Sequence, residues 1–171
     1  MKKLILMLAC PAVLLCSCGN SAPSALKEDT EKVLSNYIEQ NKAAALKELA
    51  VKAEAGEVAD IEAFLAELMP ALMQASRADG GAKEAEMTQL MVDWIVFGSE
   101  RGSASCQVVL YLLKMQQNKG TGDSAMSAVT IPGDLDDLKS DASDAVKKLE
   151  AKQDCSKFEK EALGAGKMLG L

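Results

Sequence analysis

The sequence predicts an all-α protein in which five or six antiparallel helices pack as a bundle. From Leu26 onwards, apolar residues recur at steps of three and four among many charged residues, which is the spacing of one face of an α-helix. Segments rich in glycine, proline and small polar residues separate these stretches at helix-length intervals. The chain has 171 residues, enough for one domain with a modest core.

The first twenty residues, MKKLILMLACPAVLLCSCGN, have the anatomy of an export signal. Two lysines precede an apolar run from Leu4 to Leu15, which has the length of a signal-peptide core and is too short to span a bilayer. The residues that follow, Leu-Cys-Ser-Cys-Gly at 15–19, resemble the lipobox of bacterial lipoproteins. The resemblance implies that residues 1–17 are a removed signal peptide and that Cys18 is acylated and becomes the new N-terminus.

Cys18 is the cysteine of this segment that fits the lipobox pattern. Cys16 follows the bulky Leu15 where the pattern has a small residue, and Cys10 lies inside the apolar run. The resemblance implies a protein of the bacterial cell envelope, anchored in the bilayer by two or three acyl chains, which hold it more stably than one. Gly19 favours the outer membrane in the enterobacterial sorting pattern. An ordinary cleaved signal peptide, or an uncleaved apolar start, is the alternative interpretation.

The processed chain is acidic and contains no histidine. Residues 18–25 are expected to form the lipidated cysteine and a polar tether, and residues 26–171 the helical domain. Removal of residues 1–17 takes away two lysines and no acid, so the formal charge of −6 becomes −8, which argues against nucleic acid as a partner. The absence of histidine excludes imidazole-based nucleophilic pairs and imidazole metal ligands. We therefore expect no enzyme and no cofactor.

The first three helices are predicted from apolar spacing and from the breaks between them. The first covers 26–55 and ends at a glycine. The second covers 58–77 and contains Pro70, which predicts a kink or a break because proline lacks the backbone N–H and clashes with the preceding turn. The sequence ADGGA at 78–82 predicts a turn, after which the third helix covers 83–97.

The remaining helices follow in the second half of the chain. Ser103 is the expected N-cap of a fourth helix that ends near residue 118, although its apolar centre, 108–113, is also compatible with a buried strand. A loop is expected near 119–133. The fifth helix begins near Asp134 and carries an apolar stripe at alternating steps of three and four, and a short sixth helix covers about 155–169.

The segment from Trp94, WIVFGSERGSASCQVVLYLLKMQQNKGTG, resembles one unit of the Sel-one-like branch of tetratricopeptide-type repeats. Trp94 and Gly102 fall in register, and Gly98 and Cys106 stand where the pattern has alanine. An earlier segment, KAEAGEVADIEAFLAEL, matches the pattern more weakly and aligns Gly56 with Gly102. The resemblance implies a short α-solenoid-like fragment that presents a groove to a protein or peptide, and it supplies no catalytic residues. Stacked helices of any origin produce similar spacing of small residues.

Three aromatic residues, Trp94, Phe97 and Tyr111, are the candidate binding surface, although the same residues serve equally well as core. Cys106 and Cys155 are the two thiols left after lipidation. They form either a disulfide, which an exported protein allows, or two separate thiols. A third interpretation makes Cys106, in the first turn of its helix, a reactive thiol of low pKa.

Two methionine pairs stand at i, i+4 on consecutive predicted helices: Met69 with Met73, and Met87 with Met91. A short turn between the helices would bring the pairs face to face. Thioethers bind Cu(I), so a four-sulfur site is one interpretation, but methionine commonly fills irregular helix interfaces, so we favour core packing and expect no metal site. The sequence thus predicts a non-catalytic module that binds or scaffolds another envelope protein. A thiol-redox or metal-handling protein is the alternative.

Overall fold

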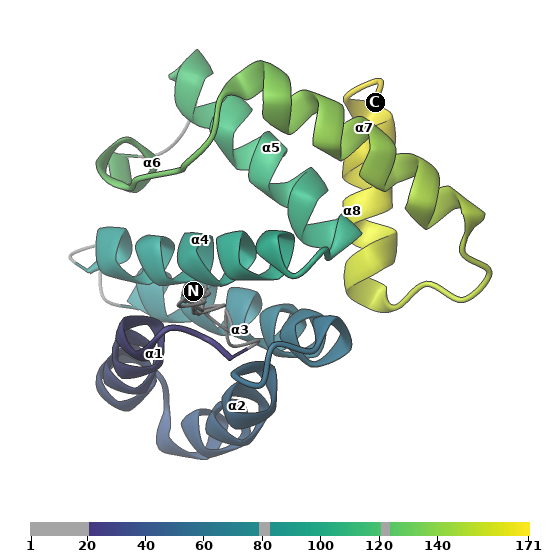
Figure 1. The fold of residues 1–171 in the computed structure, drawn as a ribbon. Helices are drawn as coiled ribbons and strands as arrows, with labels where there is room; N and C mark the ends of the chain where they lie inside the picture. The colour runs from purple at the N-terminus through teal and green to yellow at the C-terminus, as the bar shows by residue number, and fades with distance from the viewer. Residues whose placement is uncertain (1–20, 79–82, 121–123) are drawn as a thin grey trace, which may run out of the picture.

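The computed structural model describes residues 21–78, 83–120 and 124–171. Within these residues the chain forms eight α-helices and no strand (Figure 1). The all-α prediction is therefore confirmed. The helices are α1 (Ser24–Tyr37), α2 (Gln40–Ala53), α3 (Val58–Ala78), α4 (Glu84–Glu100), α5 (Ala104–Lys119), α6 (Ser124–Ala128), α7 (Leu135–Ala151) and α8 (Lys157–Met168).

The predicted count of five or six helices is too low for two reasons. The stretch predicted as one helix over 26–55 is two helices, because Ile38 and Glu39 adopt extended backbone with ψ of 137° and 138°. Ile38 is buried at this bend, so the chain turns around an apolar side chain. The second reason is α6, a short helix inside the predicted loop near 119–133.

Helix α3 runs through Pro70 without interruption, so the break allowed at this residue does not occur. Pro70 lies on the exposed side of the helix, where water can satisfy the carbonyl that loses its partner. The predicted starts of α5, α7 and α8 agree with the structure. Ser103 caps α5 by accepting the Cys106 N–H, Asp134 caps α7 by accepting the Asp136 N–H, and Ser156 and Glu159 form a capping box on α8.

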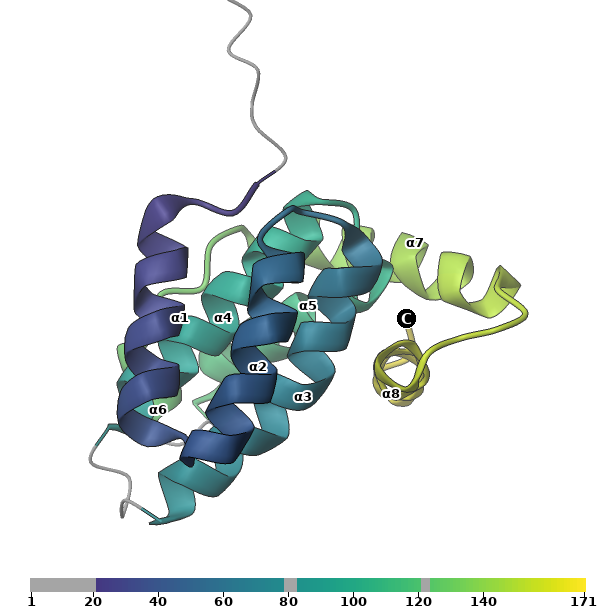
Figure 2. The same ribbon diagram turned by 90° about the horizontal axis from the view of Figure 1, so that it is seen from below.

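The helices pack in two groups around one hydrophobic core. Helices α1 to α4 form a bundle in which each packs on the next and α4 returns to α1 (Figure 1). Helix α5 packs on α4, and α7 and α8 cover the other side of α5. Figure 2 shows α1, α2 and α3 side by side, with α7 and α8 at one flank of the molecule.

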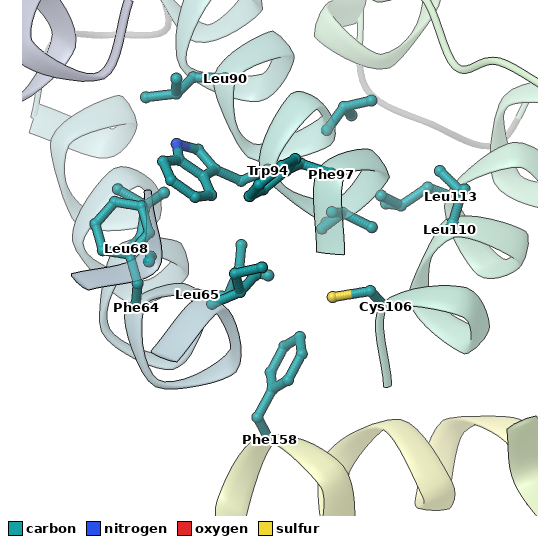
Figure 3. Packing of buried hydrophobic residues seen from close by; sticks show 14 of the residues in the cluster. Phe64, Leu65, Leu68, Leu90, Trp94, Phe97, Cys106, Leu110, Leu113 and Phe158 are labelled. Atoms are coloured by element: carbon teal, nitrogen blue, oxygen red, sulfur yellow. The ribbon is translucent and has the colours of Figure 1, made fainter. Parts of the chain in front are cut away.

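Trp94 lies at the centre of the bundle (Figure 3). Its ring makes edge-to-face contacts with Phe64 and Phe97, at centroid distances of 4.8 and 5.7 Å. The indole N–H donates to Thr30 Oγ1 at 2.8 Å, and the Thr30 hydroxyl donates in turn to the Leu26 carbonyl at 2.6 Å. The buried polar atoms of α1 and α4 are thus paired with each other, as burial requires.

The crossing of α4 and α5 depends on Gly98. A Cβ at this position would lie 2.5 Å from Cys106 Sγ and 3.1 Å from Ile61 Cγ2, so only glycine lets the helices approach this closely. The turn that follows needs Gly102, whose φ is +90°. Gly56, in the turn between α2 and α3, has a φ of +89°. The two glycines that the repeat resemblance aligns therefore have nearly the same φ.

The folded body begins earlier than the predicted boundary at residue 26. Ala22 is buried, and its N–H donates to the Glu54 carbonyl at 2.8 Å. Helix α1 starts two residues later, after Pro23. The predicted tether over residues 18–25 is consequently too long, because its second half is part of the body. None of the helices in residues 21–78, 83–120 and 124–171 combines the length and apolarity that a bilayer crossing requires.

Candidate functional site

The four methionines singled out in the sequence line one pocket of about 300 Å³ between α3 and α4. Met69 and Met73 come from the second half of α3, and Met87 and Met91 from the first half of α4. Their i, i+4 spacing places each pair on one face of its helix, and the antiparallel packing of α3 and α4 turns these faces together. The structure thus confirms that the pairs meet. The other lining residues are Leu72, Ser76, Arg77, Glu84 and Thr88.

Burial varies widely among the four methionines. Met87 is 2% exposed and belongs to the core, Met69 and Met91 are partly buried against it, and Met73 is 56% exposed. The pocket therefore runs from the core to the surface along thioether side chains. Methionine is unbranched and polarisable, so it adapts to apolar partners of different shape.

Charged and polar side chains line the pocket together with the methionines. Arg77 and Glu84, one from each helix, place opposite charges among the lining residues. Sequence reasoning missed them, although Arg77 continues the row of Met69 and Met73 at a further step of four. A pocket lined by apolar side chains and a few charges has the mixed composition of a protein–protein interface.

The amino-terminal end of α4 is braced against α1 beside this site. Glu86 accepts a hydrogen bond from the Tyr37 hydroxyl at 2.6 Å and forms an ion pair with Lys32 at 2.5 Å. The hydrogen bonds from Lys32 and then from Tyr37 lower the pKa of the Glu86 carboxyl below its usual value. This end of α4, which carries Met87, is therefore fixed on the bundle.

The predicted binding surface of Trp94, Phe97 and Tyr111 is wrong as a surface. These side chains are 0%, 4% and 7% exposed. They are the largest apolar groups on two central helices, and burying them removes the most apolar area from water. The indole N–H of Trp94 is already satisfied by Thr30 and does not face outward. The core interpretation of these three residues is the one that holds.

Cys106 and Cys155 are both free thiols in the structure, as in the separate-thiol alternative, and no disulfide joins them. Cys106 is fully buried, and burial raises the pKa of its thiol to about 12, while the polar contact with Ser103 acts in the opposite direction. The interpretation of Cys106 as a reactive thiol of low pKa is therefore wrong. Cys155 is partly buried, with Sγ 3.5 Å from the Leu149 carbonyl.

Ser103 forms a small polar cluster beside Cys106. Its side chain accepts the Cys106 N–H at 3.1 Å and donates to Glu62 Oε1 at 2.6 Å. Both Ser103 and Glu62 are buried. The cluster joins the start of α5 to α3. We interpret its role as structural because its polar atoms are hydrogen-bonded to one another.

Other hollows lie on the α1–α2–α3 side of the bundle, two of them similar in volume to the methionine pocket. One, of about 290 Å³, lies between α2 and α3 beside Pro70. The other, of about 310 Å³, lies between α1 and α2 and is lined largely by Lys and Glu side chains. The methionine pocket differs from both because side chains identified independently in the sequence converge on it.

Cys18 and the predicted signal peptide over residues 1–17 lie outside the described residues. Among the residues that are described, no three carboxylates or thiols gather closely enough to hold a metal ion. Comparison with known proteins finds no match: no family model fits the chain, and no curated protein and no solved structure is similar to it.

Proposed function

We propose that this protein is a lipoprotein of the bacterial cell envelope, anchored through an acylated Cys18, whose helical body binds another envelope protein without catalysis. The anchor rests on the lipobox-like residues 15–19, and Gly19 favours the outer membrane. The binding role rests on one structural observation, the convergence of four methionines from two helices on a pocket that reaches the surface.

The chemistry of the pocket suits an apolar side chain of a partner. Met73 offers exposed apolar area, and the thioethers behind it adjust to the shape that enters. Arg77 and Glu84 provide charges of both signs for orientation. Anchoring both proteins on one membrane raises their effective concentration, so a modest intrinsic affinity is sufficient.

The helical hairpins fit the proposed degenerate repeat. Helices α2 and α3 pack together, as do α4 and α5, and each pair is joined by a turn with a glycine at a φ near +90°: Gly56 in the first and Gly102 in the second. In repeat proteins, stacked hairpins of this kind present an extended binding surface. The methionine pocket lies between the second helix of the first pair and the first helix of the next.

Site-specific photocrosslinking in cells tests the binding role. A photoreactive amino acid is placed at Met73 or, as the matched control, at Met168, which is 85% exposed on α8 and outside the pocket. We expect one reproducible adduct from position 73, absent from position 168 and lost when Met91→Glu is added. Equal adducts from both positions, or an adduct that survives Met91→Glu, would contradict the proposal.

Binding of Cu(I) is the second candidate function, and the convergence of the four thioethers favours it. Soft sulfur ligands select this ion. Titration with Cu(I) against a competing chelator should then show one site per chain that is weakened by Met73→Leu and Met91→Leu but unchanged by Met168→Leu. If the wild-type protein takes no copper from the chelator, this candidate is removed.

A further inference from the structure

The point at which the chain enters the folded body is fixed. Ala22 is buried, and its N–H is hydrogen-bonded to the Glu54 carbonyl at the end of α2. Pro23 then leads directly into α1. Lys27, in the first turns of α1, forms an ion pair with the Glu54 carboxylate at 3.4 Å. Two contacts to Glu54 therefore hold the entry point against the turn between α2 and α3.

The covalent distance from this point to the proposed anchor is short. Four peptide units separate the Cα atoms of Cys18 and Ala22, and at 3.8 Å for each unit they lie at most about 15 Å apart whatever path the chain takes. This bound is smaller than the length of one helix of the bundle. The 14 residues of α2 alone extend over about 21 Å.

From these two facts we propose that the protein stands end-on at the lipid surface. The end formed by Ala22, the start of α1 and the α2–α3 turn faces the headgroups, and the methionine pocket is held at the opposite end. The inference rests on the proposed acylation of Cys18. Figure 2 shows the start of α1, the end of α2 and the start of α3 at one end of the bundle, the end at which Ala22 contacts Glu54.

The positions of two glutamates define the ends. Glu57 lies in the α2–α3 turn and Glu39 in the α1–α2 connection, so the full length of α2 separates them. Glu39 also lines a small hollow with Gln74 and Ala75 of α3, the half of α3 that carries Met73. Glu39 and the methionine pocket therefore lie at the same end of the bundle. Because the segment from Cys18 to Ala22 is short, this end is the one that faces away from the membrane. A partner would reach the pocket about 20 Å beyond the lipid-facing end.

The same two glutamates supply a matched pair of labelling sites. Both are exposed, both precede a helix, and replacing either removes one negative charge. Glu57→Cys and Glu39→Cys are made in a Cys155→Ser background and labelled with an environment-insensitive fluorophore. Cys106 is buried with a raised thiol pKa and does not compete for the label. The acylated full-length protein is reconstituted into phosphatidylcholine vesicles that contain a headgroup-nitroxide lipid, a short-range quencher.

We expect strong loss of fluorescence from the label at 57 and little loss from the label at 39. Insertion of twelve Gly/Ser residues between Asn20 and Ser21 should remove most of the fluorescence loss of the label at position 57, because the longer linker no longer holds this end near the headgroups. Equal loss at both sites, greater loss at 39, or a loss at 57 that the insertion leaves unchanged would each overturn the inference. Intact-mass analysis of the same sample establishes acylation separately, so failure of the anchor is distinguished from failure of the orientation.

Discussion

Replacing Gly98 by alanine tests the close crossing of α4 and α5 on which the core depends. The new methyl would meet Cys106 Sγ at 2.5 Å and Cys106 Cβ at 3.3 Å. Cys106 is fully buried and has no open space to move into, so overpacking should cost about 1–3 kcal/mol. The higher helix propensity of alanine offsets about 1 kcal/mol of this. We expect Gly98→Ala to lower the free energy of unfolding by up to about 2 kcal/mol.

A double-mutant cycle identifies the clash as the cause. Cys106→Ala alone removes the buried sulfur and should cost about 1 kcal/mol through the cavity left behind. In the double variant the methyl at 98 occupies part of that space, so the two changes should be coupled favourably by about 1–3 kcal/mol. Urea denaturation at pH 7 with unchanged m-values measures all four proteins.

Gly164→Ala is the control for helix propensity. Gly164 lies inside α8, and no atom of the surrounding structure lies within 4 Å of the place that an alanine methyl would take, so alanine should stabilise the protein by about 0.5–1 kcal/mol. If Gly98→Ala stabilises the protein as Gly164→Ala does, or if its effect adds to that of Cys106→Ala without coupling, the reasoning about the crossing is refuted.

Three further predictions concern the buried polar and thiol groups. Thr30→Val should lower the free energy of unfolding by about 1–3 kcal/mol, because the Trp94 indole loses its acceptor, whereas Thr30→Ser should retain most of the stability in the same urea assay. In folded protein an aromatic disulfide reagent should label Cys155 but not Cys106, and both should react in denaturant; fast labelling of Cys106 would contradict its burial. Burial raises the pKa of Cys106 from 9.0 to about 12, so the unfolded chain loses this proton first and stability should fall as pH rises through this range. Relative to Cys106→Ala, the wild-type protein should lose about 1 kcal/mol of unfolding free energy between pH 8 and pH 10, and an identical pH dependence of the two proteins would exclude the effect.

The helices could be predicted where spacing and capping agree. Ser103 and Asp134 stand before apolar-periodic stretches and cap α5 and α7 as expected. The bend at Ile38 was missed because the stretch around it contains no glycine or proline. The apolar spacing does not reveal the bend either, because Tyr37 with Ala44 and Ile38 with Ala45 keep the seven-residue step of an unbroken helix.

The candidate site was likewise predicted in part. The convergence of the methionine pairs followed from i, i+4 spacing on two helices joined by a short turn, and the structure confirms it. The positions of the aromatic residues could not be predicted from the sequence, because a tryptophan at helical spacing gives the same pattern whether it is exposed to a partner or buried in the core. The deciding contact is the hydrogen bond from Trp94 to Thr30 of α1, a long-range pairing that the local pattern does not contain.

The proposed anchor and the proposed orientation both depend on the covalent state of Cys18. Intact-mass analysis of the mature protein, extracted from the membranes of a bacterial host, measures this state. We expect a chain that begins at Cys18, lacks residues 1–17 and carries the added mass of a diacylglyceryl group, with or without a third acyl chain. A mature chain with an unmodified thiol at Cys18, or with its N-terminus at another residue, would contradict the anchor and the orientation that follows from it.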